Sequence, residues 1–273
     1  MSGTASPSVL LVGGGNMGAA MLGGWLAAGR PAASFTVLDP TVGPALKPIL
    51  DAWPVTHRDT PPAEPVDVLV LAVKPQMMGA VLPDLRAAVG PGTLVVSIAA
   101  GTTIDTIRQG LGARAVVRAM PNTPALIGRG VTGAFANEHV TPEQRQETDD
   151  LLGASGPVEW VGREPLIDAV TAVSGSGPAY VFLLAEALAA AGEAVGLEPD
   201  LAMRLARHTV AGAGEMMIRS SDAPEQLRRN VTSPNGTTAA ALAVLMAESG
   251  GLPELMNRAV EAARARAAEL SKD

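Results

Sequence analysis

The sequence contains no cysteine, which excludes disulfide bonds, thiolate nucleophiles and cysteine-ligated zinc sites. Aromatic residues make up only 3% of the 273 residues, and lysine occurs at just three positions. The three histidines, His57, His139 and His208, lie outside every motif described below, so we interpret them as structural or solvated and expect no metal site. The chemistry of this chain must therefore be sought in groups other than thiols and imidazoles.

Positive charge is also scarce. The formal net charge of -7 at pH 7 repels phosphate backbones and anionic lipid surfaces, so we expect neither nucleic acid nor a membrane as a partner. Hydrophobic residues make up 47% of the chain and charged residues 17%, which is typical of a chain that folds around a core. The length favours two domains, and the lack of cysteine fits a reducing cytoplasm.

The first part of the chain alternates short β-branched runs with helical patterns, which predicts a parallel sheet with crossover helices. The N-terminus has no basic segment before its first apolar run, so we interpret that run as a strand and not as a leader. Helices are expected to begin near Asn16, Met77, Thr103 and Pro142, and the charges of the last should lie on a solvated face. The predicted strands are Val9–Val12, Phe35–Leu38, Val66–Val73, Leu94–Ile98, Ala115–Met120 and Val131–Ala136.

After Glu164 and Pro165 long Ala/Leu-rich helical patterns replace the strands. We therefore predict a doubly wound, mostly parallel α/β Rossmann domain over 1–162, followed by an all-α dimerisation domain over 163–273. Such an apolar helical domain is expected to bury its surface against a second copy, which predicts a homodimer or a higher oligomer. The predicted helices are Ala179–Val195, Pro199–Ser220, Gly236–Glu248 and Pro253–Leu270.

A glycine-rich loop, GGGNMG, follows the first predicted strand and opens a helix. In this context the pattern G-x-G-x-x-G is typical of dinucleotide binding. Gly13 permits the tight turn, Gly15 lets the backbone approach a pyrophosphate, and Gly18 lets the helix pack closely on the strand. We expect Gly13, Gly15 and Gly18 to form the contact with NAD(P)H, with the phosphates at the helix N-terminus.

Asp39 ends the second predicted strand, about 20 residues after Gly18. A carboxylate there accepts hydrogen bonds from the adenosine ribose and repels a 2′-phosphate, which favours NADH over NADPH. The alternative interpretation is that Asp39, which precedes Pro40, only starts a turn.

Two further loops leave predicted strands at the edge where open α/β sheets bind ligands. Ala72, Val73, Lys74 and Pro75 close one strand, and the segment RAMPNTP follows the next but one. The second loop offers the amide of Asn122 beside the expected nicotinamide. Each loop taken alone is more often an ordinary connection.

The helical half holds two more motifs. The segment SGSGPAY leads into the most apolar predicted helix, where its glycines suit close packing or approach to a ligand. The segment VTSPNGTT turns into another helix, an arrangement that presents hydroxyls and free amides to an anion such as a carboxylate. Simple helix capping explains this second motif equally well.

Taken together and in this order, VGGGNMG, AVKP, RAMPNTPA, AVSGSGPAY and VTSPNGTT resemble the pyrroline-5-carboxylate reductase family. The resemblance spans nearly the whole chain and departs at Asn235, where the family usually has a second glycine; Asn tolerates a left-handed backbone. It implies an NAD(P)H-dependent oxidoreductase of proline biosynthesis that reduces the cyclic imine of 1-pyrroline-5-carboxylate. It also implies that 163–273 binds the substrate, held by Ser233, Gly236, Thr237 and Thr238, with Thr238 nearest the ring nitrogen as the catalytic residue. The residues that it implies for the dinucleotide are Asn16, Met17, Lys74, Pro75 and Asn122.

Other readings stay open at this point. The chain could be another imine reductase, or a β-hydroxyacid oxidoreductase of similar domain order. The latter family depends on a lysine in the first long helix of the helical domain, and Ala179–Val195 contains none. A third alternative is a protein that senses a dinucleotide without turnover, which would have no use for the loop from Ser233 to Thr238.

Overall fold

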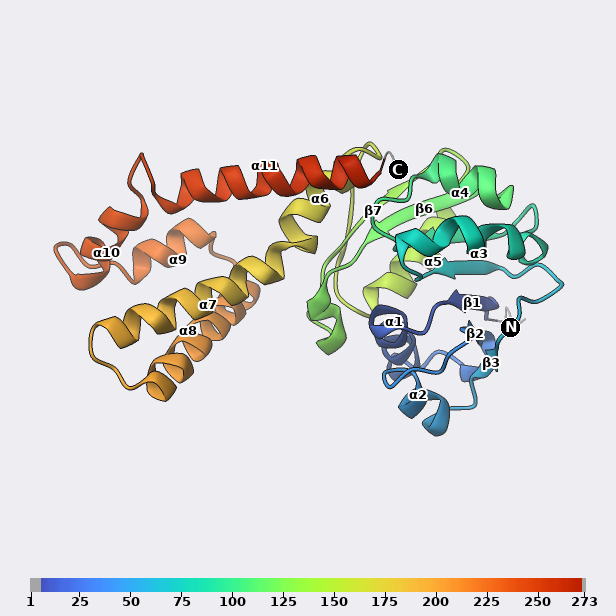
Figure 1. Cartoon of the computed structure of the whole chain (residues 1–273), viewed down its shortest axis with the longest axis horizontal. Helices are drawn as coiled ribbons and strands as arrows, with labels where there is room; N and C mark the ends of the chain where they lie inside the picture. The colour runs from blue at the N-terminus through green and yellow to red at the C-terminus, as the bar shows by residue number, and fades with distance from the viewer. Residues whose placement is uncertain (1–5, 272–273) are drawn as a thin grey trace. The chain divides into compact units, whose positions relative to one another are not determined.

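The computed structural model describes residues 6–271, which form two compact units (Figure 1). The first comprises the chain up to Gly175 and the C-terminal residues from Ala263, and the second comprises Ser176–Ala262. Residues 1–5 and 272–273 lie outside the described part of the chain.

An eight-stranded sheet organises the first unit, in the order β3-β2-β1-β4-β5-β6-β7-β8. All neighbouring strands are parallel except β6 and β7, which pair antiparallel. The order of the first six is that of a dinucleotide-binding Rossmann sheet, so the predicted fold class is confirmed. The strands are β1 Val9–Val12, β2 Phe35–Leu38, β3 Thr56–Arg58, β4 Val68–Leu71, β5 Leu94–Ser97, β6 Ala115–Met120, β7 Thr132–Ala136 and β8 Val158–Trp160.

Alternate residues of the central strands enter two separate hydrophobic clusters, because successive side chains of a strand point to opposite faces. One face packs against α1 (Asn16–Ala27) and α5 (Pro142–Gly153), and the other packs against α3 (Met78–Asp84) and α4 (Ile104–Leu111). Leu10 and Leu11 illustrate the pattern, since both are fully buried but belong to different clusters. Burial on both faces explains why these strands read as continuous apolar runs.

The sequence pattern missed the two strands at the edges of the sheet. All three residues of β3 are exposed, so the strand carries no apolar alternation that could predict it. The predicted strand Val66–Val73 is shorter than expected, and the ends of two others shift by one residue. The shorter elements of this unit are η1 Ala32–Ser34, α2 Lys47–Ala52, η2 Pro75–Met77, η3 Arg86–Ala88 and η4 Thr123–Ile127.

The charged face of α5 is less solvated than predicted. Glu147 accepts a 2.6 Å ion-paired hydrogen bond from Arg30, and Asp149 accepts one of 2.7 Å from the indole of Trp160. The guanidinium of Arg145 also stacks over Trp160, 3.8 Å from the ring centroid. Residues distant in the sequence therefore bind charged side chains of α5 that the sequence pattern assigned to a solvated face.

The change to helical sequence near Gly162 precedes the division between the compact units. Helix α6 (Leu166–Val170) packs against β6 and β7, and the π-helical turn η5 (Thr171–Gly175) continues it. Gly133 on β7 permits this packing, because a Cβ there would collide with the side chain of Val170. Residues 163–175 therefore stay with the sheet, although their secondary structure belongs to the helical half.

The second unit is all-helical and buries little of its apolar surface. Its buried hydrophobic residues are Ala189, Ala202 and Ala206, where α7 and α8 pack against each other. Large side chains remain exposed, among them Phe182 and Leu183, each with 62% of its surface accessible. A unit without its own core needs a further surface to cover it. The helices are α7 Gly177–Ala194, α8 Pro199–Arg219, α9 Pro224–Asn230, α10 Thr237–Leu245 and α11 Leu252–Leu270, the last of which continues into the first unit.

Candidate active site

The glycine loop between β1 and α1 has the geometry that the motif predicts. Gly13 adopts a φ of 99°, and its amide donates a 2.9 Å hydrogen bond to the carbonyl of Leu38. A Cβ at Gly18 would collide with the carbonyl oxygen of Gly13, so only glycine lets the helix start this close to the strand. Gly13 and Gly18 thus shape the loop.

Gly15 differs because a Cβ at this position would meet no protein atom within 4 Å. It is the N-cap of α1, and no side chain caps the helix. The first amides of α1 are therefore uncapped beside a backbone that has open space in front of it. This arrangement fits the pyrophosphate of a dinucleotide.

Asp39 starts the turn that was its alternative interpretation, and it also supports the glycine loop. Its Oδ1 accepts a 2.9 Å hydrogen bond from the amide of Thr41, which makes the turn, and its Oδ2 accepts one of 2.7 Å from the amide of Gly14. The carboxylate thereby ties the end of β2 to the glycine loop. It also lines the cavity described next, so the turn and a role in ligand binding do not exclude each other.

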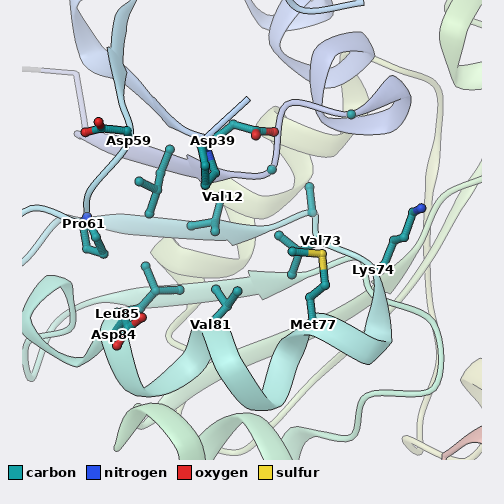
Figure 2. Close-up of a pocket in the computed structure, with 15 residues that line it drawn as sticks. Val12, Asp39, Asp59, Pro61, Val73, Lys74, Met77, Val81, Asp84 and Leu85 are labelled. Atoms are coloured by element: carbon teal, nitrogen blue, oxygen red, sulfur yellow. The ribbon is translucent and has the colours of Figure 1, made fainter. Parts of the chain in front are cut away.

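A cavity of about 350 Å³ lies at the carboxyl ends of β1, β2 and β4 (Figure 2). Three aspartates contribute to its lining, and Lys74 is the one lysine or arginine among the lining residues. The predicted residues Gly13, Gly15, Ala72 and Val73 lie here too. Residues that the sequence did not single out are Val12, Leu38, Pro40, Asp59, Pro61, Met77, Val81, Asp84 and Leu85.

A second cavity, of about 310 Å³, shares Ala72, Val73 and Lys74 with the first and extends toward β6. The predicted residues Met17, Pro75 and Asn122 line it. The Oδ1 of Asn122 already accepts a 2.9 Å hydrogen bond from the amide of Val131, so the Nδ2 group is the part of this side chain left for a ligand. This cavity is also lined by Met120, Pro121, Thr123 and Gly175 of the RAMPNTP and SGSGPAY motifs, and by Ile98, Ala99 and Ala100, which the sequence did not single out.

Two predicted residues lie elsewhere. Gly18 lines neither cavity, in keeping with its packing role. Asn16 lines an open groove of about 860 Å³ along α1, together with small residues such as Gly23 and Gly24. The remaining predicted cofactor residues divide between the two adjoining cavities.

The loop before α10, in the second unit, forms a tight turn. Gly236 donates a 3.1 Å hydrogen bond to the carbonyl of Ser233, Pro234 occupies the second position, and Asn235 has a φ of 57°. These features match a type II turn, in which asparagine can replace the glycine of the third position. A Cβ at Gly236 would collide with the Oγ of Ser233, so a larger residue there would force that hydroxyl to move.

Thr237 and Thr238 form the first turn of α10, whose N-cap is Gly236. No side chain caps this helix, so the capping alternative weighed for the motif does not describe the geometry. The first turn of α10 therefore carries two hydroxyl side chains and uncapped amides, directly after the turn from Ser233 to Gly236. Such a helix start suits an anionic group.

Comparisons with known families agree with both halves of the chain. Residues 8–101 match the model of the NADP oxidoreductases described as coenzyme F420-dependent. Residues 164–270 match the model described as pyrroline-5-carboxylate reductase dimerisation.

Relatives that match nearly the whole chain include pyrroline-5-carboxylate reductases. The pyrroline-5-carboxylate reductase of Pseudomonas aeruginosa is 44% identical over 98% of each chain, and that of Pasteurella multocida is 40% identical over 97% of this chain and 98% of its own. Among solved structures, the pyrroline-5-carboxylate reductase of Coxiella burnetii superposes with a TM-score of 0.90 at 39% identity, over 98% of this chain and 99% of its own. The Plasmodium falciparum pyrroline carboxylate reductase, solved with NADP bound, has a TM-score of 0.81 at 29% identity, over 98% and 100% of the two chains. Identity of this level over the full length places the chain in the pyrroline-5-carboxylate reductase family.

Proposed function

We propose that this protein reduces 1-pyrroline-5-carboxylate to proline with NAD(P)H, as the last step of proline biosynthesis. The observation that carries the proposal is the full-length similarity to pyrroline-5-carboxylate reductases, combined with an intact Rossmann glycine loop and an uncapped helix start at the family's signature loop. A β-hydroxyacid oxidoreductase is disfavoured by the same similarity and by the lack of lysine in α7.

The two adjoining cavities divide the dinucleotide between them. The cavity at Asp39 would hold the adenosine half, and the pyrophosphate would cross at Gly15 and the start of α1. The cavity at Met17, Pro75 and Asn122 would hold the nicotinamide. The NADP found in the Plasmodium falciparum relative supports a dinucleotide in this fold.

Asp39 favours NADH over NADPH in this assignment. Its carboxylate lines the cavity together with Asp59 and Asp84, and this concentration of negative charge opposes a 2′-phosphate. Because each oxygen of Asp39 accepts one backbone hydrogen bond, a lone pair on each remains for ribose hydroxyls. Both cofactors stay candidates for use, with NADH the better one.

The loop from Ser233 to Thr238 would bind the product proline as well as the substrate. The amides at the start of α10, with Ser233, Gly236 and Thr237, would hold the carboxylate, and the hydroxyl of Thr238 would lie at the ring nitrogen. A reduced nicotinamide supplies a hydride to the imine carbon. An imine that arrives protonated needs no strong acid from the protein, so the work of these residues is to orient the ring.

The second unit is proposed to pair with a second copy of itself. Its large exposed apolar side chains and its match to a dimerisation family both support this. Leu166–Ala194 is a helical stretch long and apolar enough to cross a membrane by length and composition, but the dimer accounts for the same surface. We retain 163–273 as the dimerisation and substrate-binding part, 1–162 as the dinucleotide-binding part, and the cytoplasm as its location.

A spectrophotometric assay tests the proposal. The purified protein should oxidise NADH only after 1-pyrroline-5-carboxylate is added, and proline should accumulate in equal amount. Oxidation with a β-hydroxyacid or its keto acid, and none with the cyclic imine, would overturn it. Binding of NADH without any turnover would instead indicate a dinucleotide sensor.

A further inference from the structure

Arg118 is a buried cation that the proposed reaction does not use. It lies on β6, two residues before Met120, and only 3% of its surface is accessible. Its Nη1 donates to Oε1 of Glu164 at 3.3 Å, and its Nη2 donates to Oδ1 of Asp168 at 3.1 Å and to Oγ of Ser271 at 3.3 Å. Arg118 does not line either cavity of the cofactor site.

Each carboxylate partner of Arg118 belongs to a segment that leads to the nicotinamide-side cavity. Oε1 of Glu164 also accepts a 2.8 Å hydrogen bond from the amide of Ile104, where α4 begins shortly after the cavity residue Ala100. Asp168 lies on α6, which continues through the turn η5 to the cavity residue Gly175.

Two of the segments that line this cavity are also in contact with each other. A Cβ added at Gly175 would lie 2.8 Å from Cε of Met120, so the η5 turn and the end of β6 are in close contact. The segments that contain Ala100, Met120 and Gly175 therefore line the same cavity. One guanidinium connects them, because Arg118 lies on β6 and reaches the other two segments through Glu164 and Asp168. A planar guanidinium fixes the direction of each hydrogen bond, which a flexible ammonium does not.

We propose that Arg118, through Glu164 and Asp168, is a positioning residue that sets the shape of the nicotinamide-side cavity. The inference rests on the proposed function only in assigning the nicotinamide to this cavity. It implies that the network affects the nicotinamide half of the cofactor and leaves the adenosine half alone. A purely structural ion cluster would instead affect stability without distinguishing the two halves.

Comparing NADH with ADP-ribose, which lacks the nicotinamide, tests the inference. In Arg118→Lys the affinity for ADP-ribose should stay within about twofold of the wild type, because the first cavity lies apart from the network. NADH should lose the extra affinity that the nicotinamide gives it. Hydride transfer to 1-pyrroline-5-carboxylate in a single turnover should fall about tenfold to a hundredfold, since small misplacements of reacting groups are costly.

Arg30→Lys is the matched control, because Arg30 forms a part-buried 2.6 Å ion pair with Glu147 and lines none of the cavities described above. It should change the melting temperature without changing the ratio of NADH to ADP-ribose affinity. If Arg118→Lys fails to fold, Asp168→Asn keeps the size of the partner and should lower the same ratio. The inference is overturned if the folded network variant behaves like Arg30→Lys.

The proposed function can fail separately. A wild-type protein that binds NADH more tightly than ADP-ribose but does not reduce the imine would contradict the reaction, while the affinity ratio would still decide the role of Arg118. A wild type in which the nicotinamide adds no affinity would contradict the positioning role, whatever the turnover.

Discussion

Single side chains at this site have structural roles beside the binding roles proposed for them. Asp39 makes a turn and supports the glycine loop through its two oxygens, so its replacement should also disturb the backbone at Gly14. Asn235 takes the left-handed conformation that the family leaves to glycine. The turn at Asp39 and the backbone of Asn235 follow from local sequence, which is why the motifs predicted them, whereas the bond from Gly14 to Asp39 joins residues 25 positions apart and was not predicted. Asp59 was missed because it follows β3, a strand without an apolar pattern.

Replacing Asp39 with Ser should lower the KM for NADPH several-fold and raise the KM for NADH, because the variant loses a charge that opposes the 2′-phosphate. Steady-state kinetics with both cofactors measure this. Asp39→Asn is the control for the loop, since it removes the charge but keeps an oxygen for the amide of Gly14. A wild type that strongly prefers NADPH contradicts this reading of Asp39.

Removing the hydroxyl of Thr238 should affect chemistry more than cofactor binding. Thr238→Ala is expected to lower kcat by roughly tenfold, because one hydrogen bond in a desolvated site is worth about 1 to 2 kcal/mol. Dinucleotide affinity should barely change. Thr237→Ala is a neighbouring control for the stability of α10. An unchanged single-turnover rate combined with a lower melting temperature would assign Thr238 to the helix start alone.

At the scale of elements, apolar periodicity predicted the central strands and long helices because each buries a defined face. Ion pairs between distant segments left no local signal. The partners Glu164 and Asp168 lie 46 and 50 residues from Arg118, and no spacing rule joins them. The same holds for α6, whose place against the sheet depends on Gly133 and Val170.

Helix α5 offers a test of local stabilisation. Thr141 and Gln144 form a reciprocal capping box at its N-terminus, so Thr141→Ala should lower the free energy of unfolding by about 1 kcal/mol. Urea denaturation at pH 7 measures this, and no loss would show that the cap is dispensable. Thr106→Ala on α4, which leaves the capping Oγ1 of Thr103 in place, should cost less.

The pH dependence of α5 follows from Glu143. Its own backbone amide, and then the hydroxyl of Thr141, hold the pKa of Glu143 below its ordinary value of 4.5. A lowered folded-state pKa stabilises the protein above pH 4.5, and this contribution disappears as the pH falls through the folded-state pKa. Thr141→Ala should therefore raise the pKa of Glu143 in an NMR titration. An unchanged pKa would show that the hydroxyl of Thr141 does not stabilise the Glu143 carboxylate.

For the whole molecule, sequence composition predicted two parts and a helical half that needs a partner. It could not predict that the end of α11 belongs with the sheet, because contacts of Ser271 with Arg118 and Asp168 bridge more than 100 positions. The exposed apolar side chains of the second unit are a surface that pairing with a second chain would cover.

The wild type is expected to be an obligate dimer or larger, since dissociation would expose these side chains to water. Phe182→Glu on α7 should weaken association in light scattering, because it places a charge on this surface. Trp53→Glu, at an exposed apolar position of the first unit, should not. A stable, active wild-type monomer would contradict the proposed pairing.

Hydride transfer from a nicotinamide to a cyclic imine is the reaction proposed for this chain. The most direct measurement supplies NADH deuterated at the transferred position of C4, with 1-pyrroline-5-carboxylate as the acceptor. Mass spectrometry and NMR should find one deuterium in proline, on the ring carbon that was the imine carbon. Proline without deuterium, or no proline while NADH is bound, would contradict the account.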